Sequence, residues 1–101
     1  MYDIAIIGGG PAGLAAGLYG ARGGMDTVLL ENMLVGGQIT KTTQVDNYPG
    51  FPDGIDGFAI GTNMQKQAER FGLEIKRTGV DSVELEGEIK RLHCGREVIE
   101  A

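Results

Sequence analysis

The stretch Gly8-Gly9-Gly10-Pro11-Ala12-Gly13 decides the fold that this sequence predicts. It matches the pattern G-x-G-x-x-G, in which the first glycine permits a tight turn and the second lets a pyrophosphate approach the backbone. The third glycine, here Gly13, allows a helix to lie close against the preceding strand. Pro11 suits the first turn of that helix, whose N–H groups would face the phosphates. The stretch therefore predicts a dinucleotide-binding loop between a strand and a helix.

The segments on either side of the loop supply the strand and the helix that the pattern needs. Residues 2–7 form a short apolar run rich in isoleucine, which is typical of a strand buried on both faces of a parallel sheet. From Pro11 onwards, apolar residues recur at helical spacing until a glycine pair at positions 23 and 24 ends the helix. Residues 26–31 predict a second strand, and the crossover that leads to it is expected to be right-handed.

Glu31 ends the second predicted strand, eighteen residues after Gly13. An acid at about this distance usually accepts hydrogen bonds from the ribose hydroxyls of an adenosine moiety. The plainer interpretation is a solvated carboxylate at the end of a strand. The combination of loop, strands, helix and acid favours dinucleotide binding, but by itself it leaves FAD and NAD as alternatives.

The middle of the chain predicts a long loop followed by a helix. Residues 32–55 carry several glycines, prolines and an Asn with little periodicity, which indicates a loop, and long loops in compact domains are usually functional. The helix that follows has Asp56 as its expected N-cap and Gly72 as its terminator. Its predicted core-facing stripe consists of Phe58, Ile60, Met64, Ala68 and Phe71.

The C-terminal part of the chain predicts four short strands. Residues 73–75 would add a third parallel strand, while residues 80–85, 88–94 and 96–99 alternate around glycine-containing turns and indicate an antiparallel meander. The predicted fold class is therefore α/β: a Rossmann-like, three-layer, cofactor-binding fold with a parallel sheet and a C-terminal antiparallel β-meander. Because the chain ends while still strand-like, we expect residues 1–101 to be the truncated, N-terminal part of a larger domain.

Composition and charge argue against several other classes of protein. The 101 residues fit one small domain, and 42% hydrophobic against 23% charged residues argue against disorder. A net charge of -5 and a pI of about 4.7 oppose binding to nucleic acid or to an anionic membrane surface. No apolar run is long enough to predict a signal sequence or a membrane span. A single cysteine, Cys94, and a single histidine, His93, predict neither an internal disulfide nor a metal site, which fits a reducing, cytoplasmic setting.

Two further motifs follow Glu31: Gly36-Gly37-Gln38, and the run Val45-Asp46-Asn47-Tyr48-Pro49-Gly50-Phe51-Pro52. Together with the glycine loop, at these separations, they make the chain resemble bacterial thioredoxin reductases, in the pyridine nucleotide-disulfide oxidoreductase family, over nearly its whole length. The resemblance implies that the glycine loop binds FAD and that the Gly-Gly-Gln loop lies along the flavin. It also implies that Asn47 sits near the isoalloxazine ring, although from the residues alone an Asn before Tyr-Pro-Gly is more readily a turn residue.

The predicted site is therefore a cofactor-binding one. The expected FAD-binding residues are Gly8, Gly10, Pro11, Ala12, Gly13, Glu31, Asn32, Gly36, Gly37, Gln38 and Asn47. Side chains such as Gln38 and Asn47 offer both donors and acceptors to the polar edge of a flavin. No catalytic residue and no metal ligand are expected in this chain.

The sequence also departs from the family pattern. Members of the family need a Cys-x-x-Cys disulfide and a second glycine-rich unit for NADPH, and this chain has neither. Cys94 lies in a strand-like segment and is expected to be a small buried thiol. The resemblance thus implies the FAD-binding portion of an NADPH-dependent thioredoxin-disulfide reductase, a homodimer when intact, that acts on thioredoxin or a thioredoxin-like protein. The 101-residue chain alone is expected to be inactive and to bind flavin weakly at best.

Two alternatives remain open at this point. A related flavoprotein of the ferredoxin-NADP reductase branch or of the peroxiredoxin-reducing branch could share the same N-terminal region. A non-catalytic dinucleotide-binding module is compatible with the same glycines and with Glu31, since a fold alone does not fix a function.

Overall fold

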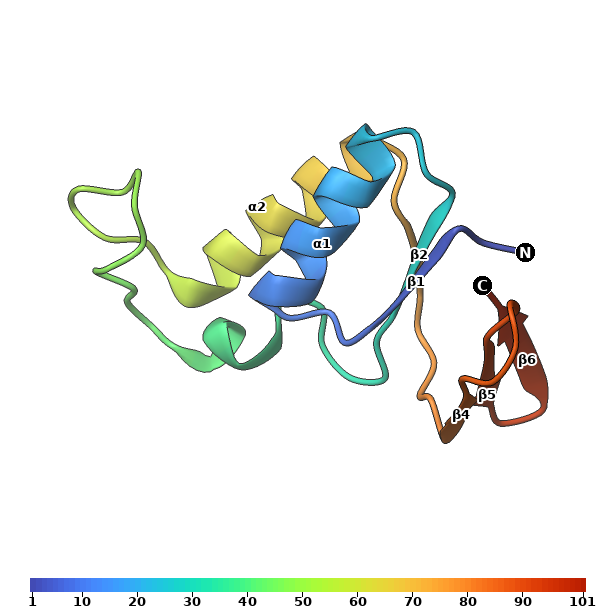
Figure 1. Ribbon diagram of the computed structural model, residues 1–101. Helices are drawn as coiled ribbons and strands as arrows, with labels where there is room; N and C mark the ends of the chain where they lie inside the picture. Colours follow the sequence, from blue (N-terminus) through green and yellow to red (C-terminus); the bar gives the residue numbers. More distant parts are fainter.

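The computed structural model describes residues 1–101 and shows two sheets and two main helices (Figure 1). In chain order the elements are β1 (Ile4–Ile7), α1 (Pro11–Arg22), β2 (Thr27–Leu30), η1 (Gly37–Lys41), α2 (Gly57–Arg70), β3 (Glu74–Lys76), β4 (Ser82–Glu84), β5 (Arg91–Cys94) and β6 (Glu97–Glu100). Here η1 is a short 3-10 helix. The strand-helix-strand start predicted from the glycine loop is confirmed, as are the second helix and the third parallel strand.

The first sheet is parallel, and β2 lies between β1 and β3. All four residues of β2 are buried because both faces of this central strand are covered. Leu29 packs towards the helices, in a core cluster with Leu14, Val35, Ala68 and Leu73. Val28 and Leu30 point to the opposite face, in a second cluster with Leu92, Cys94 and Ile99. Alternate side chains of one strand therefore join two cores.

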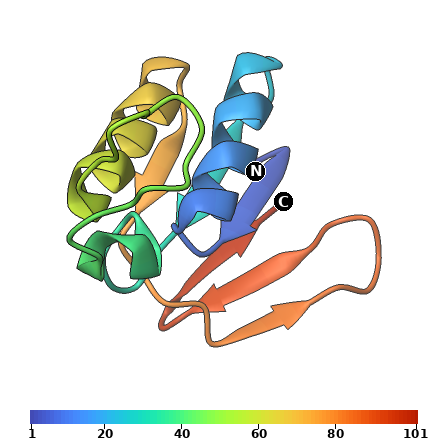
Figure 2. The same cartoon turned by 90° about the vertical axis from the view of Figure 1, so that its left-hand side faces the viewer.

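The second sheet is the predicted meander, with β5 between β4 and β6 and both pairings antiparallel. Figure 2 shows α1 and α2 on one side of the parallel sheet and the meander on the other, so the three-layer prediction is confirmed. The backbone N–H of Tyr2 donates to the carbonyl of Glu100 over 3.0 Å, which places the two ends of the chain side by side. The helices of this chain lack the length and the apolar character that a membrane-spanning helix requires.

The helix α2 begins and ends where the sequence predicts. The Asp56 carboxylate accepts a hydrogen bond from the N–H of Ala59 at 3.1 Å, which caps the helix. Gly72 follows the last turn with a φ of 104°, a conformation that favours glycine. Its predicted core stripe was wrong for Phe58, which is 54% exposed. At about 100° per residue Phe58 lies about 200° around the helix from buried Ile60, so it faces solvent.

Phe71 is the second error in the predicted stripe. It is the C-cap residue of α2 rather than part of its helical face, and it is 36% exposed. The Arg70 guanidinium lies 4.9 Å from the centre of its ring. The remaining members of the stripe, Ile60, Met64 and Ala68, are buried or packed against the helix-side core, as predicted.

Removing the cap of α2 should weaken the fold measurably. We expect Asp56→Ala to lower the free energy of unfolding by about 1 kcal/mol, because it leaves an N–H of the first turn without its acceptor. Asp56→Asn keeps an acceptor oxygen and should lose much less. Urea unfolding followed by circular dichroism measures both variants. Equal stability of Asp56→Ala and the parent chain would show that the cap does not stabilise α2.

The predicted long loop over residues 32–55 is only partly a loop. It contains η1 and an isolated antiparallel bridge between Val45 and Ile55, whose two backbone hydrogen bonds measure 2.7 and 2.9 Å. Gly36 and Gly37 have φ values of 109° and 68°, so the chain reverses there and enters η1. Five helical residues are too few to give the sequence a readable period, which explains the missed element.

Cys94 is buried in β5, at 5% exposure, as the sequence predicts. Burial is the main reason why the pKa of its thiol is raised, with the nearby Glu97 and Asp81 carboxylates adding to the effect. A buried, neutral thiol is a packing residue rather than a nucleophile.

Candidate functional site

The predicted glycine loop connects β1 to α1 at the carboxyl end of the parallel sheet. Gly8 has a φ of 103°, and its N–H donates to the Leu30 carbonyl over 2.9 Å, which holds the loop against β2. A Cβ on Gly13 would lie 1.9 Å from the Gly8 carbonyl oxygen. Only glycine at position 13 therefore lets α1 start directly beside the loop.

The start of α1 presents backbone donors that have no acceptor in the protein. Gly10 is the N-cap residue and has no side chain to cap the helix, and Pro11 has no N–H. The first backbone bond of the helix runs from the Leu14 N–H to the Gly10 carbonyl, at 2.9 Å. The N–H groups of Gly10, Ala12 and Gly13 make no hydrogen bond within the chain. Such groups carry the partial positive charge of the helix dipole and suit an anion.

The loop is also open on the side where a ligand would approach. A Cβ built on Gly10 would meet nothing closer than the Gly37 Cα, 4.0 Å away. Glycine at position 10 is therefore not required by packing within the chain. Its missing side chain instead leaves space beside the unbonded N–H groups, which is the role that the sequence pattern predicts for it.

Glu31, directly after β2, is fixed beside the glycine loop by two hydrogen bonds. One carboxylate oxygen accepts from the Gly9 N–H at 2.8 Å and the other from the Met33 N–H at 2.9 Å. The bonds from Met33 and then Gly9 are the main reasons why the pKa of Glu31 is lowered, so the side chain is ionised near neutral pH. A carboxylate oxygen has more than one lone pair, so both oxygens can still accept hydroxyl donors. The geometry therefore favours a binding role over a freely solvated carboxylate.

Gly9 is a residue of the site that the sequence prediction left out. It donates to Glu31, and its backbone is buried against that side chain, since an added Cβ would lie 3.1 Å from the Glu31 Cβ. The signal that could have identified it is a glycine at a position where the pattern accepts any residue. Gly9 therefore couples the loop to the acid.

The second glycine pair packs against the first loop. The Gly36 N–H donates to the Gly9 carbonyl over 2.6 Å, and a Cβ on Gly37 would lie 2.9 Å from the Gly10 Cα. Both glycines have positive φ values, which other residues rarely adopt. The two glycine-rich segments, distant in sequence, thus form one continuous backbone surface.

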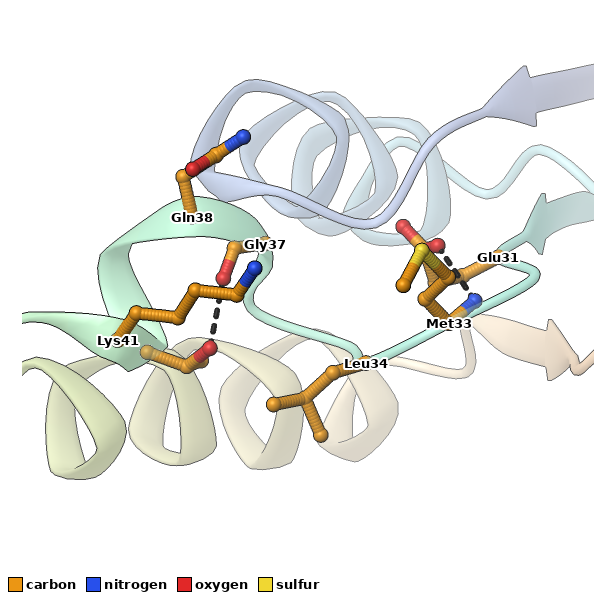
Figure 3. Close-up of a pocket in the computed structure, with 7 residues that line it drawn as sticks. Glu31, Met33, Leu34, Gly37, Gln38 and Lys41 are labelled. Atoms are coloured by element: carbon orange, nitrogen blue, oxygen red, sulfur yellow. Dashed lines mark hydrogen bonds between the residues drawn. The ribbon is translucent and has the colours of Figure 1, made fainter.

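A pocket of about 150 Å³ opens between this surface and Glu31 (Figure 3). It is lined by Glu31, Met33, Leu34, Gly37, Gln38, Thr40 and Lys41. Three of these, Glu31, Gly37 and Gln38, are predicted site residues, and the other four were missed. Met33 is apolar and 76% exposed, so its side chain is accessible to a ligand in the pocket. The pocket is smaller than the roughly 300–1,000 Å³ of whole small-molecule sites, so it accounts for only part of a dinucleotide.

Asn32 and Asn47 are the predicted site residues that neither line the pocket nor belong to the two glycine-rich segments beside it. Asn32 is exposed, and its side chain lies beside Gly79, where an added Cβ would be 3.1 Å from the Asn32 Cγ. Asn47 is exposed in the loop closed by the bridge between Val45 and Ile55, which projects beyond the start of α2 in Figure 1. Their roles as cofactor ligands stay predictions.

The sequence matches the family model of pyridine nucleotide-disulphide oxidoreductases over residues 2–99. The chain belongs to this family. Among its relatives, the thioredoxin reductase of Mycolicibacterium smegmatis is 41% identical over 101 residues, covering 100% of this chain and 32% of the relative. That of Peptoclostridium litorale is 51% identical over 92 residues, covering 91% and 29%. The chain thus spans about a third of the length of the curated relatives it matches.

Solved structures agree with this assignment. The thioredoxin reductase of Lactococcus lactis superposes with a TM-score of 0.95 at 36% identity, covering 100% of this chain and 33% of that chain. A ferredoxin-flavin thioredoxin reductase from Clostridium acetobutylicum gives a TM-score of 0.88 at 30% identity, covering 99% and 34%. For this pyridine nucleotide-disulphide oxidoreductase family member, both the predicted resemblance to thioredoxin reductases and the predicted Rossmann-like fold are confirmed.

Proposed function

We propose that this chain forms the FAD-binding part of an NADPH-dependent thioredoxin-disulfide reductase. The observation that carries the proposal is the set of unbonded N–H groups at the start of α1 beside an anchored carboxylate, Glu31, at the end of β2. This geometry occurs in a chain whose relatives are named thioredoxin reductases.

The residues around the glycine loop fit the adenosine diphosphate part of FAD. The N–H groups of Gly10, Ala12 and Gly13 would donate to the pyrophosphate oxygens, and the missing side chain of Gly10 leaves room for them. Glu31 would accept hydrogen bonds from the ribose hydroxyls. These two contacts together require a ligand that carries both a pyrophosphate and an adjacent ribose.

The flavin part of the cofactor would extend along the second glycine segment. Gly37 and Gln38 line the pocket next to the first loop, so they are placed to continue the same surface. Gly36 supports that surface through its bond to Gly9. Asn32 and Asn47 are proposed as cofactor ligands on family resemblance alone.

The chain's own residues would bind and orient the cofactor and perform no step of the reaction. When bound, FAD supplies the redox chemistry that links a hydride donor to a disulfide. Cys94 cannot serve as that disulfide, because it is a single cysteine and it is buried. We therefore expect no disulfide-reductase turnover from the 101-residue chain by itself.

The proposal extends to the substrate, the oligomeric state and the reductant of the whole protein. Its substrate would be thioredoxin or a thioredoxin-like protein, and the enzyme would be a homodimer. The similarity to a ferredoxin-flavin thioredoxin reductase at 30% identity favours ferredoxin as a second candidate reductant beside NADPH. Both kinds of enzyme share the region that this chain spans, so the choice of reductant depends on other residues.

The native gene product tests the proposal. We expect a polypeptide about three times as long as this chain, with flavin absorption bands and with thioredoxin reduction driven by NADPH; reduction driven only by ferredoxin would select the second candidate. A colourless species of 10.7 kDa without activity would contradict the proposal and would favour a small binding module.

A further inference from the structure

Lys41 is the one basic side chain that lines the pocket. It is the last residue of η1 and is exposed, and its side chain takes part in none of the ion pairs or side-chain hydrogen bonds of the chain. Figure 3 shows its side chain reaching from η1 towards Gly37. An unpaired ammonium group is thus presented to the same space as the Glu31 carboxylate.

The charges around the pocket explain what such a group could do. The chain has a net charge of -5, and Glu31 places an ionised carboxylate in the wall of the pocket itself. A pyrophosphate that enters beside this carboxylate is repelled by it, and the N–H groups of α1 provide only partial positive charge in compensation. Lys41 supplies the full positive charge that the backbone cannot.

We infer that Lys41 is a positioning residue that pairs with a phosphate of the bound adenine dinucleotide. The inference deepens the proposed function and rests on it, since it takes the ligand to contain a pyrophosphate. Lys41 belongs neither to the glycine pattern nor to the Gly-Gly-Gln segment, so this role adds a residue to the proposed site. A lysine suits this role because its ammonium is a mobile point charge that does not need a fixed, planar partner.

A purely structural role for Lys41 makes a different prediction. A basic residue in the last turn of a helix stabilises the helix dipole slightly, whatever ligand is bound. If that were its whole role, neutralising Lys41 would change binding of charged and uncharged ligands alike. Pairing with a phosphate instead affects only ligands that carry the phosphate.

The test is a titration of Lys41→Met with ADP and with adenosine, followed by NMR chemical shifts of the protein. We expect ADP to bind to Lys41→Met roughly 3- to 10-fold more weakly than to the parent chain. This factor corresponds to the loss of one charged contact, which is weakened because it is exposed to solvent. Adenosine binding should be unchanged, Lys41→Arg should retain most of the ADP affinity, and the loss should shrink at high salt. Lys66→Met, which removes an exposed lysine of α2 outside the pocket, is the matched control and should bind ADP like the parent chain.

Each outcome separates this inference from the proposed function. Unchanged ADP affinity in Lys41→Met, or an equal loss for ADP and adenosine, would overturn the role of Lys41 while leaving the cofactor site in place. A parent chain that binds neither ADP nor FAD would overturn both. Thermal unfolding of each variant, followed by circular dichroism, verifies that the compared chains are equally folded.

Discussion

Replacing Gly13 with alanine should strongly destabilise the native fold. The new Cβ would lie 1.9 Å from the Gly8 carbonyl oxygen and 3.0 Å from the Gly8 carbonyl carbon. Both are backbone atoms, so no change of rotamer relieves the clash, and α1 has to move away from the loop and from the core that Leu14 enters. Overpacking in a core costs about 1–3 kcal/mol or more, against a total stability of about 5–15 kcal/mol for a chain of this size. Circular dichroism and urea unfolding measure the loss.

Gly10→Ala is the matched control for Gly13→Ala. Its added methyl group meets no atom closer than 4.0 Å, so the chain should fold as before. The methyl group would occupy the space next to the unbonded N–H groups, and we expect it to weaken ADP binding. A Gly13→Ala chain that unfolds at the same urea concentration as the parent would refute the proposed packing of α1 on the loop.

Replacing Glu31 with glutamine should weaken both cofactor binding and the fold. Glutamine keeps the size of the side chain but has one acceptor oxygen, so the Gly9 or the Met33 N–H would face an NH₂ group instead of an acceptor. Leaving such a donor unpaired costs about 1–3 kcal/mol. We expect ADP affinity to fall roughly tenfold or more, because the ribose also loses a charged acceptor. Titration with ADP measures the binding, and Glu74→Gln, an exposed site on β3, is the control.

The same glutamate gives a pH dependence whose sign follows from its pKa. The pKa of Glu31 is lower in the folded chain than in the unfolded chain, because the bonds from Met33 and Gly9 favour the ionised form. Its contribution to stability is therefore fully present above the pKa that Glu31 has in the unfolded chain, and is lost as the pH falls through the lower pKa of the folded chain. Glu31→Gln should remove this part of the acid sensitivity. If Glu31→Gln and the parent chain lost the same stability towards low pH, Glu31 would not contribute to the acid sensitivity.

The elements predicted best from the sequence are those whose signals are local. The glycine loop, α1 and β2 follow from residue types at fixed spacing, and Asp56 with Gly72 marks the ends of α2. The errors lie where the spatial context decides. Phe58 is apolar but points away from the core, and η1 depends on two glycines with positive φ rather than on any periodicity.

The candidate site was predictable in its glycines and its acid but not in its walls. The pattern identifies Gly10 and Glu31 because the chemistry of a pyrophosphate and a ribose fixes their residue types. Met33 and Lys41 have no comparable constraint, since many side chains can line a pocket, and only the chain reversal at Gly36 brings η1 towards the loop. Tertiary contacts of this kind leave no regular trace in a single sequence.

The most direct test of the central claim is a titration of the isotope-labelled chain with FAD, ADP and riboflavin, followed by the NMR shifts of its backbone amides. The claim predicts that FAD and ADP shift the amides of residues 8–10, 12–13 and 31–33, and that FAD also shifts those of residues 36–38. Riboflavin, which lacks the pyrophosphate and the adenosine, should leave the amides of the glycine loop unchanged. Amides of the glycine loop and of Glu31 that do not respond to millimolar FAD or ADP, or that respond equally to riboflavin, would contradict it.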